Sequence, residues 1–298
     1  MTTFTSEDRE AVEKINKPLC IYHGNCADGF TAAWVVKRAW AEAGIEVEFH
    51  AGVYNQPAPD VTGRRVIIVD FSYKSEVIKE MAKVASSILI LDHHQTAIQD
   101  LEGFTDPNVE LVLDKSKSGA GLAWSYYYED LGIQPPPLLN HVQDRDLWKF
   151  ELPFTREISA AIFSYEYTFE NWDKLMYHTD PQTLITEGEA LERKHFKDIK
   201  ELLKVSSRLM YIGDNLVKAA NIPYTMSSDA CHILIEEGQP FGACYYDGPQ
   251  YRTFSLRSMD DGPDVAKIAE SYGGGGHRNA SGFRVTHEQA TEMCFNEN

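Results

Sequence analysis

Paired cysteines, long apolar runs and an excess of basic residues are all missing from this sequence. Its five cysteines are an odd number and form no C-x-x-C pair, which disfavours a disulfide scaffold and a zinc finger and favours a reducing, cytoplasmic setting. No uncharged apolar run approaches the ~18–20 residues that cross a bilayer, and the first twenty residues alternate charges without the apolar stretch of a signal peptide. We therefore expect no membrane partner.

The scarcity of positive charge disfavours a protein that binds long duplex nucleic acid. Lys and Arg number 28 against 45 Asp and Glu, so the formal net charge is −17. A protein that coats long duplex nucleic acid needs a basic face for the phosphates, so we expect no such partner. The remaining composition, 43% hydrophobic and 11% aromatic, is that of a folded globular chain, and 298 residues fit about two domains of usual size.

Short apolar runs alternate with helical patterns over the first half of the chain. This alternation predicts an α/β fold with a parallel sheet, in which ligands bind beyond the carboxyl ends of the strands. Runs rich in β-branched residues, such as Val66-Ile67-Ile68-Val69, are typical of strands buried on both faces. The expected strands are 18–22, 46–50, 66–69, 87–91 and 111–113, and the expected helices include 30–43, 75–84 and 118–127.

The second half of the chain has a different character. Residues 185–217 are predicted to form one or two long helices, and residues 241–246 and 251–256 a hairpin, followed by a helix over 265–271. We therefore expect three parts: a catalytic domain over 1–180, a helical connector over 181–220 and a smaller α+β domain over 221–298.

Three neighbouring strand ends carry metal-binding side chains. The first strand ends at His23, the third at Asp70 and the fourth at Asp92, which is followed by His93 and His94. Carboxylate and imidazole together suit Mn or Mg, with Zn or Fe as further options. Asp28 follows His23, and Asp144 and Asp146 lie near the end of a predicted helix, so all three are further candidates.

A glycine-rich segment near the C-terminus has the composition of an anion site. Four glycines, 273–276, precede His277 and Arg278, with Ser281 shortly after. Glycines there expose backbone N–H groups to an anion, and an arginine adds a bidentate contact. Arg257, at the end of a predicted strand, supplies another cation.

These motifs, in this order from residue 23 to residue 282, resemble the DHH phosphoesterase superfamily with its DHH-associated C-terminal domain. The match comprises His23 with Asp28, Asp70, Asp92-His93-His94, Asp144 and the Gly273–Gly282 segment. The superfamily includes nanoRNases, RecJ-type exonucleases, cyclic-dinucleotide phosphodiesterases, exopolyphosphatases and family II pyrophosphatases. The resemblance implies a Rossmann-like N-terminal DHH domain, a smaller C-terminal α+β domain and an active site in the cleft between them.

The resemblance also implies a site with two Mn²⁺ ions, for which Mg²⁺ or Co²⁺ are possible substitutes. Asp70 bridges the metals in this assignment, His23 binds one of them, and Asp28, His93 and Asp144 bind the other. Asp92 orients an imidazole, and His94 faces the substrate phosphate as hydrogen-bond donor or general acid. Water activated between the metals attacks phosphorus in line. The implied substrate-binding residues are Arg257, Gly274, Gly275, Gly276, His277, Arg278 and Ser281.

The sequence departs from the family pattern in its first motif. Family members usually have two Asp separated by one residue, whereas Cys26 occupies the position two before Asp28. The Cys26 thiolate or the carbonyl of Asn25 are the candidate substitutes, and we hypothesise that the His23 metal site is the weaker one. Asp146 remains an alternative to Asp144 as the last ligand.

The favoured function is hydrolysis of phosphodiester bonds in short oligonucleotides or dinucleotides. An acidic chain suits a small substrate better than a long strand. The second half carries Tyr245, Tyr246, Tyr251 and Phe254, which are candidates for stacking a base, although packing in the core is their favoured role. The alternatives are an exopolyphosphatase or pyrophosphatase type of hydrolase, a cyclic-dinucleotide phosphodiesterase, and a degenerate nucleotide-binding protein without activity. A homodimer is left open.

Overall fold

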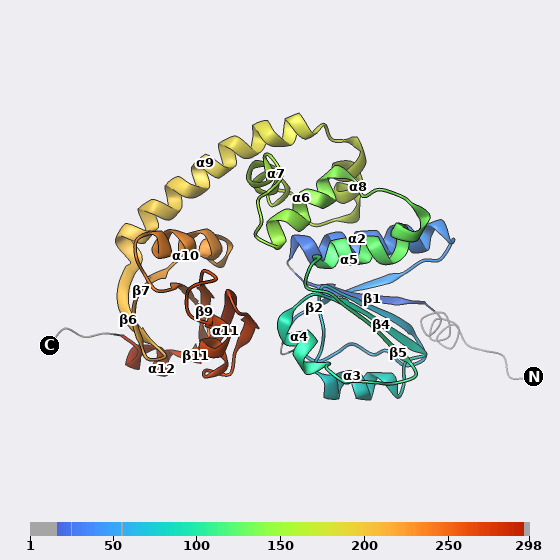
Figure 1. Ribbon diagram of the computed structural model, residues 1–298, viewed down its shortest axis with the longest axis horizontal. Helices are drawn as coiled ribbons and strands as arrows, with labels where there is room; N and C mark the ends of the chain where they lie inside the picture. Colours follow the sequence, from blue (N-terminus) through green and yellow to red (C-terminus); the bar gives the residue numbers. More distant parts are fainter. Residues whose placement is uncertain (1–16, 25, 55, 295–298) are drawn as a thin grey trace, which may run out of the picture. The chain divides into compact units, whose positions relative to one another are not determined.

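The computed structural model describes residues 17–24, 26–54 and 56–294. The chain divides into two compact units, Met1–Glu189 and Ala190–Asn298, and each has its own sheet (Figure 1). None of the described helices has the length and apolar character of a membrane span.

The first unit is built on a parallel sheet of five strands in the order β2-β1-β3-β4-β5, as the alternating pattern predicts. Cys20, Ile67, Val69 and Leu91 pack on one face of the sheet, while their neighbours Ile21, Ile68 and Ile90 pack on the other. Because both faces are covered, the strands are apolar along most of their length. Their bounds are β1 Leu19–His23, β2 Glu48–Gly52, β3 Arg65–Val69, β4 Ser87–Asp92 and β5 Val109–Leu113.

Helices cover both faces of this sheet (Figure 1). The first face packs against α2 and α5, and the second against α3. Three further helices, α6, α7 and α8, contribute to the core on the first face. The helix bounds are α2 Ala27–Glu42, α3 Ser75–Ala82, α4 Gln95–Asp100, α5 Gly119–Tyr128, α6 Pro137–Asp146, α7 Thr155–Ile162 and α8 Phe169–His178, with a short 3-10 turn, η1, at Glu129–Leu131.

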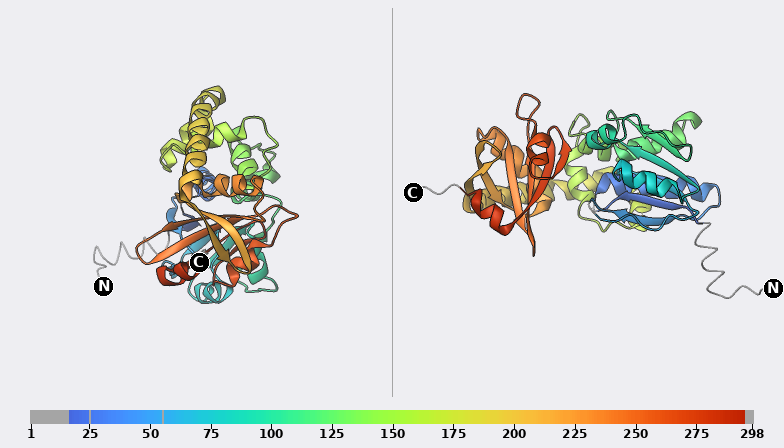
Figure 2. Two further views of the ribbon diagram at one scale, coloured as in Figure 1. Left: turned by 90° about the vertical axis from the view of Figure 1, so that its left-hand side faces the viewer. Right: turned by 90° about the horizontal axis from the view of Figure 1, so that it is seen from below.

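The second unit has a mixed sheet of six strands in the order β10-β11-β9-β8-β7-β6, shown from two further sides in Figure 2. Only β7 and β8 pair in parallel among its described strands. This α+β unit confirms the predicted fold class for the second half. Its elements are β6 Ser207–Ile212, β7 Asn215–Asn221, η2 Tyr224–Met226, α10 Ser227–Glu236, β8 Gly242–Asp247, β9 Tyr251–Arg257, α11 Val265–Glu270, β10 Gly275–His277, β11 Ala280–Thr286 and α12 His287–Glu292.

The predicted helix over 185–217 is wrong in its last third. The helix α9, Pro181–Ser206, ends before the hairpin of β6 and β7 begins. Met210 and Ile212 are buried while Leu209 and Tyr211 are exposed, which is the two-residue period of a strand. Gly213, with a φ of +57°, opens the two-residue turn of this hairpin. The predicted connector over 181–220 therefore contains one helix and two strands, and the predicted domain limits stay predictions.

Candidate metal centre

The candidate site lies at the carboxyl ends of three strands that are neighbours in the sheet, β1, β3 and β4. His23 is the last residue of β1, Asp92 is the last residue of β4, and Asp70 directly follows β3. Asp70 has a φ of +53°, a left-handed conformation that is strained for a residue with a Cβ, and its N–H donates to Leu91 O. The strand topology therefore brings together three residues that are far apart in the sequence.

Asp70 is the centre of the cluster. Its side chain is 1% exposed, and its Oδ1 lies 3.1 Å from His93 Nε2. Its Oδ2 lies 3.4 Å from His23 Nδ1, and the His94 ring is 3.9 Å from Oδ1. Burial alone would raise the pKa of Asp70, but the adjacent imidazoles of His23 and His93 outweigh burial and hold the pKa well below its usual range.

Asp70, His93 and His94 form one group of potential metal ligands, and a second group also contains His93. Asp28, in the first turn of α2, and Asp146, at the end of α6, each offer an oxygen that lies with His93 within 4.8 Å. Burial and the negative charges of Asp146 and Asp70 raise the pKa of Asp28 well above its ordinary value. Burial would lower the pKa of His93, but its hydrogen bond with Asp70 and the charge of Asp146 raise that pKa to about 10. The group carries more negative charge than its surroundings compensate.

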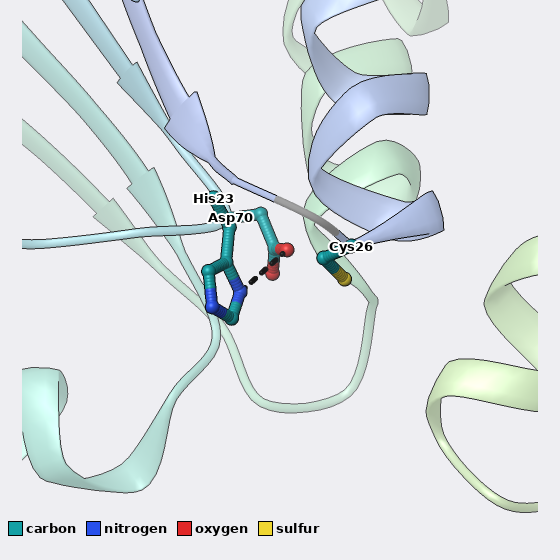
Figure 3. Close-up of side chains that lie close together, drawn as sticks. All are labelled: His23, Cys26 and Asp70. Atoms are coloured by element: carbon teal, nitrogen blue, oxygen red, sulfur yellow. Dashed lines mark ion pairs between the residues drawn. The ribbon is translucent and has the colours of Figure 1, made fainter. Parts of the chain in front are cut away.

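Cys26 belongs to a third group of potential metal ligands, together with His23 and Asp70. Its sulfur, a ring nitrogen of His23 and an oxygen of Asp70 lie within 4.8 Å of one another. Figure 3 shows the His23 ring and the Cys26 sulfur on either side of the Asp70 carboxylate. Burial and the charges of Asp70 and Asp146 raise the pKa of the Cys26 thiol, and only the Gly29 N–H acts in the opposite sense. The other candidate substitute, Asn25, lies outside the described residues.

Asp144, the predicted last ligand, lies outside these groups. Its Oδ1 accepts from the N–H of Glu151 at 2.9 Å, and its Oδ2 accepts from the N–H of Leu152 at 3.1 Å and from Thr155 Oγ1 at 2.6 Å. Both oxygens are therefore occupied in holding the loop that follows α6. Asp146, the alternative, lies 3.5 Å from His93 Nε2 and belongs to a group of potential metal ligands with Asp28 and His93.

Asp92 is placed to orient its neighbours. Its Oδ1 accepts from the N–H groups of His93 and His94, at 2.7 and 3.1 Å, and lies 2.7 Å from His94 Nδ1. A carboxylate is an acceptor, so His94 carries its proton on Nδ1 in this contact and its Nε2 faces away from Asp92. Asp92 therefore fixes the direction of the His94 ring, and its role in catalysis stays a prediction.

Several polar atoms in the cluster are buried without a hydrogen-bond partner among the described residues. They are one oxygen each of Asp28, Asp70 and Asp92, and Nδ1 of His23. Leaving a buried polar atom unpaired costs about 1–3 kcal/mol, and more for a charged group, so native proteins rarely keep four such atoms together without a ligand. A divalent cation would supply both the missing partner and the missing positive charge. The donor set of carboxylates and imidazoles therefore fits a divalent metal such as the Mn²⁺ that the resemblance implies.

Three comparisons with known proteins bear on this centre. No protein-family model matches the chain. Uncharacterized protein R106 of Acanthamoeba polyphaga mimivirus is 32% identical over 284 residues, which are 88% of this chain and 66% of that protein. Oligoribonuclease NrnB of Bacillus subtilis is 24% identical over 237 residues, which are 72% of this chain and 56% of NrnB.

The structure of RecJ in complex with Mn²⁺, from Thermus thermophilus, matches with a TM-score of 0.55 and 18% identity. The match covers 95% of this chain and 52% of the RecJ chain. The chain therefore has a RecJ-like fold, and its membership of the DHH superfamily stays a prediction. It spans about two thirds or less of the length of these three relatives.

In the C-terminal unit, two predicted substrate-binding side chains already have protein partners. Arg257 donates to Leu256 O and to Ser228 Oγ, and burial lowers its pKa. Ser281 Oγ donates to Val265 O and is buried. Both side chains therefore hold this unit together, whatever else they bind.

The glycine-rich segment near the C-terminus forms a strand rather than an open loop. Gly275, Gly276 and His277 form β10, the edge strand of the second sheet, which pairs with β11. A Cβ on Gly276 would lie 2.5 Å from Ala280 O, and a Cβ on Gly274 2.2 Å from Gly282 O. Close backbone packing thus accounts for these glycines. Arg278, in the turn, donates to Met259 O and Gly262 O and fixes the loop around them.

Sequence reasoning missed several residues that surround the cluster of acids and histidines around Asp70. Ser118 Oγ donates to Asp28 Oδ1 at 2.6 Å, and Ala120 N–H donates to the same oxygen at 3.1 Å. Gly119 makes room for the acids, because a Cβ there would lie 2.3 Å from Asp70 Cβ. The ring of Tyr54 packs against the His23 ring, with centroids 5.3 Å apart. The helix-capping pattern at Ser118 was visible in the sequence, but its contact with Asp28 was not.

Proposed function

We propose that the chain is a metal-dependent phosphoesterase that hydrolyses phosphodiester bonds in short oligonucleotides or dinucleotides. The observation that carries the proposal is the buried cluster of carboxylates and imidazoles around Asp70, in which one oxygen each of Asp28 and Asp70 and Nδ1 of His23 have no hydrogen-bond partner among the described residues. The similarity to an oligoribonuclease and to a Mn²⁺-bound RecJ supports the substrate class and the choice of metal. Two Mn²⁺ ions, with Mg²⁺ or Co²⁺ as substitutes, are the proposed cofactors.

The ligands of the proposed centre form two sets. His23, Cys26 and Asp70 form one set, and Asp28, His93 and Asp146 form the other. Asp70 links the two, because its Oδ1 lies 3.1 Å from His93 Nε2. Asp144 is left out, because both of its oxygens hold the loop after α6. When bound, divalent ions at such a site neutralise phosphoryl charge and lower the pKa of water to near neutrality.

His94 is the proposed group for the substrate phosphate. Asp92 fixes the ring through Nδ1, so the opposite nitrogen, Nε2, is held in one direction. A fixed imidazole N–H can donate to a phosphate oxygen or give its proton to the leaving oxygen. The edge strand β10 (Gly275–His277), with Gly274 and Arg278 beside it, is the proposed substrate-binding surface of the C-terminal unit, and Arg257 and Ser281 support it from within that unit.

A substrate panel tests this function. The full chain with added Mn²⁺ is assayed on the linear dinucleotide pApA, a short RNA, a long RNA, cyclic di-AMP, pyrophosphate and polyphosphate. We expect the highest kcat/KM on pApA and the short RNA, with mononucleotides as products. Preferred turnover of polyphosphate or pyrophosphate would replace the oligonucleotide assignment. Failure of every substrate, with metal bound, would favour a nucleotide-binding protein without activity.

A further inference from the structure

Cys26 stands where the family pattern has a carboxylate, and its position is that of a ligand. It is the residue before α2, and its sulfur lies within 4.8 Å of a ring nitrogen of His23 and an oxygen of Asp70 (Figure 3). These three donors come from the end of β1, from the start of α2 and from the end of β3. A nitrogen, a sulfur and an oxygen therefore converge on one point.

A second observation is that the polar atoms of Asp70 and His23 beside Cys26 are buried without a hydrogen bond within the described part of the chain. Asp70 is 1% exposed, and its Oδ2 has no hydrogen-bond partner among the described residues. The same holds for Nδ1 of His23, which lies 3.4 Å from that oxygen. A buried carboxylate oxygen that accepts no hydrogen bond, with an imidazole and a thiol beside it, is the arrangement expected around a cation.

The other cysteines of the described chain do not share these surroundings. Cys20, Cys231 and Cys244 are fully buried within hydrophobic clusters. Cys294 is partly buried and lies in the C-terminal unit, where its backbone forms a β-bridge with Met210. Among the described cysteines, Cys26 alone belongs to a group of potential metal ligands.

We propose that Cys26 binds one of the two metals as a thiolate, together with His23 and Asp70, and that this position prefers a thiophilic ion such as Zn²⁺ or Co²⁺ over Mn²⁺. Thiolate ligands favour Zn²⁺ and related ions, and Mn²⁺ stands lowest in the affinity series of divalent first-row metals. The thiol gives its proton to solvent when the metal binds. The other set, Asp28, His93 and Asp146, contains no sulfur and suits Mn²⁺. The inference rests on the two-metal centre of the proposed function and makes that centre asymmetric.

Cobalt spectroscopy tests the sulfur ligand without any assay of activity. The full chain is stripped with a chelator, reduced and titrated with Co²⁺. We expect two bound Co²⁺ and a sulfur-to-cobalt charge-transfer band in the near ultraviolet. Cys26→Ser and Cys26→Asp should lose the band, whereas the control Cys294→Ser should keep it. Cys26→Asp restores an oxygen donor, so it should also bind the second Mn²⁺ more tightly than the wild type does.

Two Co²⁺ bound without the band, or a band that survives the Cys26 substitutions, would overturn the thiolate assignment and leave the proposed phosphoesterase intact. Absence of any bound Co²⁺, Zn²⁺ or Mn²⁺ in the wild type would overturn both.

A measurement on the wild type alone guards against variants that fail to fold. The reduced chain is alkylated with iodoacetamide in the presence of Zn²⁺, of Mn²⁺ or of neither, and the cysteine peptides are quantified by mass spectrometry. We expect Zn²⁺ to protect Cys26 and Mn²⁺ to protect it much less, while labelling of Cys294 stays unchanged. Equal labelling of Cys26 in all three conditions would contradict the inference.

Discussion

Two aspartates of α6, two positions apart, have separate tasks. Successive helical residues are about 100° apart around the axis, so the side chains of Asp144 and Asp146 leave the helix in nearly opposite directions. Asp144 accepts hydrogen bonds from Glu151, Leu152 and Thr155, whereas Asp146 faces His93. The sequence alone could not separate them, because both are acids at the end of one predicted helix.

Exchanging each aspartate for asparagine should separate stability from metal binding. Asp144→Asn weakens three hydrogen bonds of a buried group, so we expect a loss of about 1–3 kcal/mol in the free energy of unfolding with Mn²⁺ stoichiometry unchanged. Asp146→Asn relieves repulsion with Asp28 and Asp70, so the metal-free protein should be no less stable while one Mn²⁺ is lost. Thermal unfolding with and without Mn²⁺, and metal analysis, measure both. The reverse pattern would return the ligand role to Asp144.

Asp144 should also contribute to acid sensitivity. Burial would raise its pKa, but the hydrogen bonds from Thr155, Glu151 and Leu152 outweigh burial and lower it. A carboxyl with a depressed pKa stabilises the fold fully above its unfolded value of about 3.9, and this contribution disappears as the pH falls through the lower folded pKa. The stability difference between the wild type and Asp144→Asn should therefore be constant near neutrality and shrink below about pH 4. Urea unfolding over that range, in the absence of metal, measures it; a difference that grows on acidification would contradict the assignment.

The adjacent histidines should respond differently to alanine. His93 lies between Asp70 and Asp146, so His93→Ala should abolish turnover and remove a metal. His94 is held by Asp92, so His94→Ala should keep both metals and lower kcat by about 10²–10⁴-fold, the usual contribution of general acid–base catalysis. Metal analysis alongside steady-state kinetics separates the two. Loss of metal in His94→Ala would make it a ligand rather than a substrate contact, and activity within tenfold of wild type in His93→Ala would refute the metal assignment.

At the scale of elements, the start of α5 is fitted closely to the acids. Gly119 has no room for a side chain, because a Cβ would lie 2.3 Å from Asp70 Cβ and 2.9 Å from Asp28 Oδ2. Gly119→Ala should therefore shift α5 or the carboxylates and weaken Mn²⁺ binding as well as stability, by about 1–3 kcal/mol for overpacking. Gly103→Ala is a control without close packing. The φ of +72° at Gly103 strains an alanine, but a Cβ added there would meet no atom of the described residues within 4 Å apart from its chain neighbours. Equal Mn²⁺ affinity in the two variants would show that this close packing does not support the site.

The elements of the parallel sheet were predictable because burial on both faces leaves an unbroken apolar run. Val66–Val69 and Ser87–Leu91 have this pattern, and they are strands in the structure. The hairpin of β6 and β7 was not predictable in the same way, because its alternating pattern follows directly on the helical pattern of α9. Polar residues at strand ends pointed to the cluster, since parallel strands share one carboxyl edge. The contacts of Ser118 and Gly119 with the acids depend on tertiary packing that no local pattern encodes.

At the scale of the whole molecule, the charge balance limits the substrate. The site gathers the carboxylates of Asp28, Asp70, Asp92 and Asp146, whose charge two divalent ions would cancel, but most of the net −17 lies elsewhere in the chain. Phosphates beyond those held at the site would meet an acidic surface and release few counterions. Length of the nucleic acid should therefore add little to its binding.

The dependence of hydrolysis on salt tests this limit. For single strands, the logarithm of affinity falls with the logarithm of salt concentration by about 0.7 for each phosphate contact. With Mn²⁺ saturating, we expect log kcat/KM to fall with a slope of magnitude about 1.4 or less for pApA, which carries two phosphates. The slope for a long RNA should be the same, because the net charge of −17 disfavours contacts with additional phosphates. A slope that steepens with RNA length, toward the value for about six contacts, would show that a basic path for a long strand exists despite the net charge.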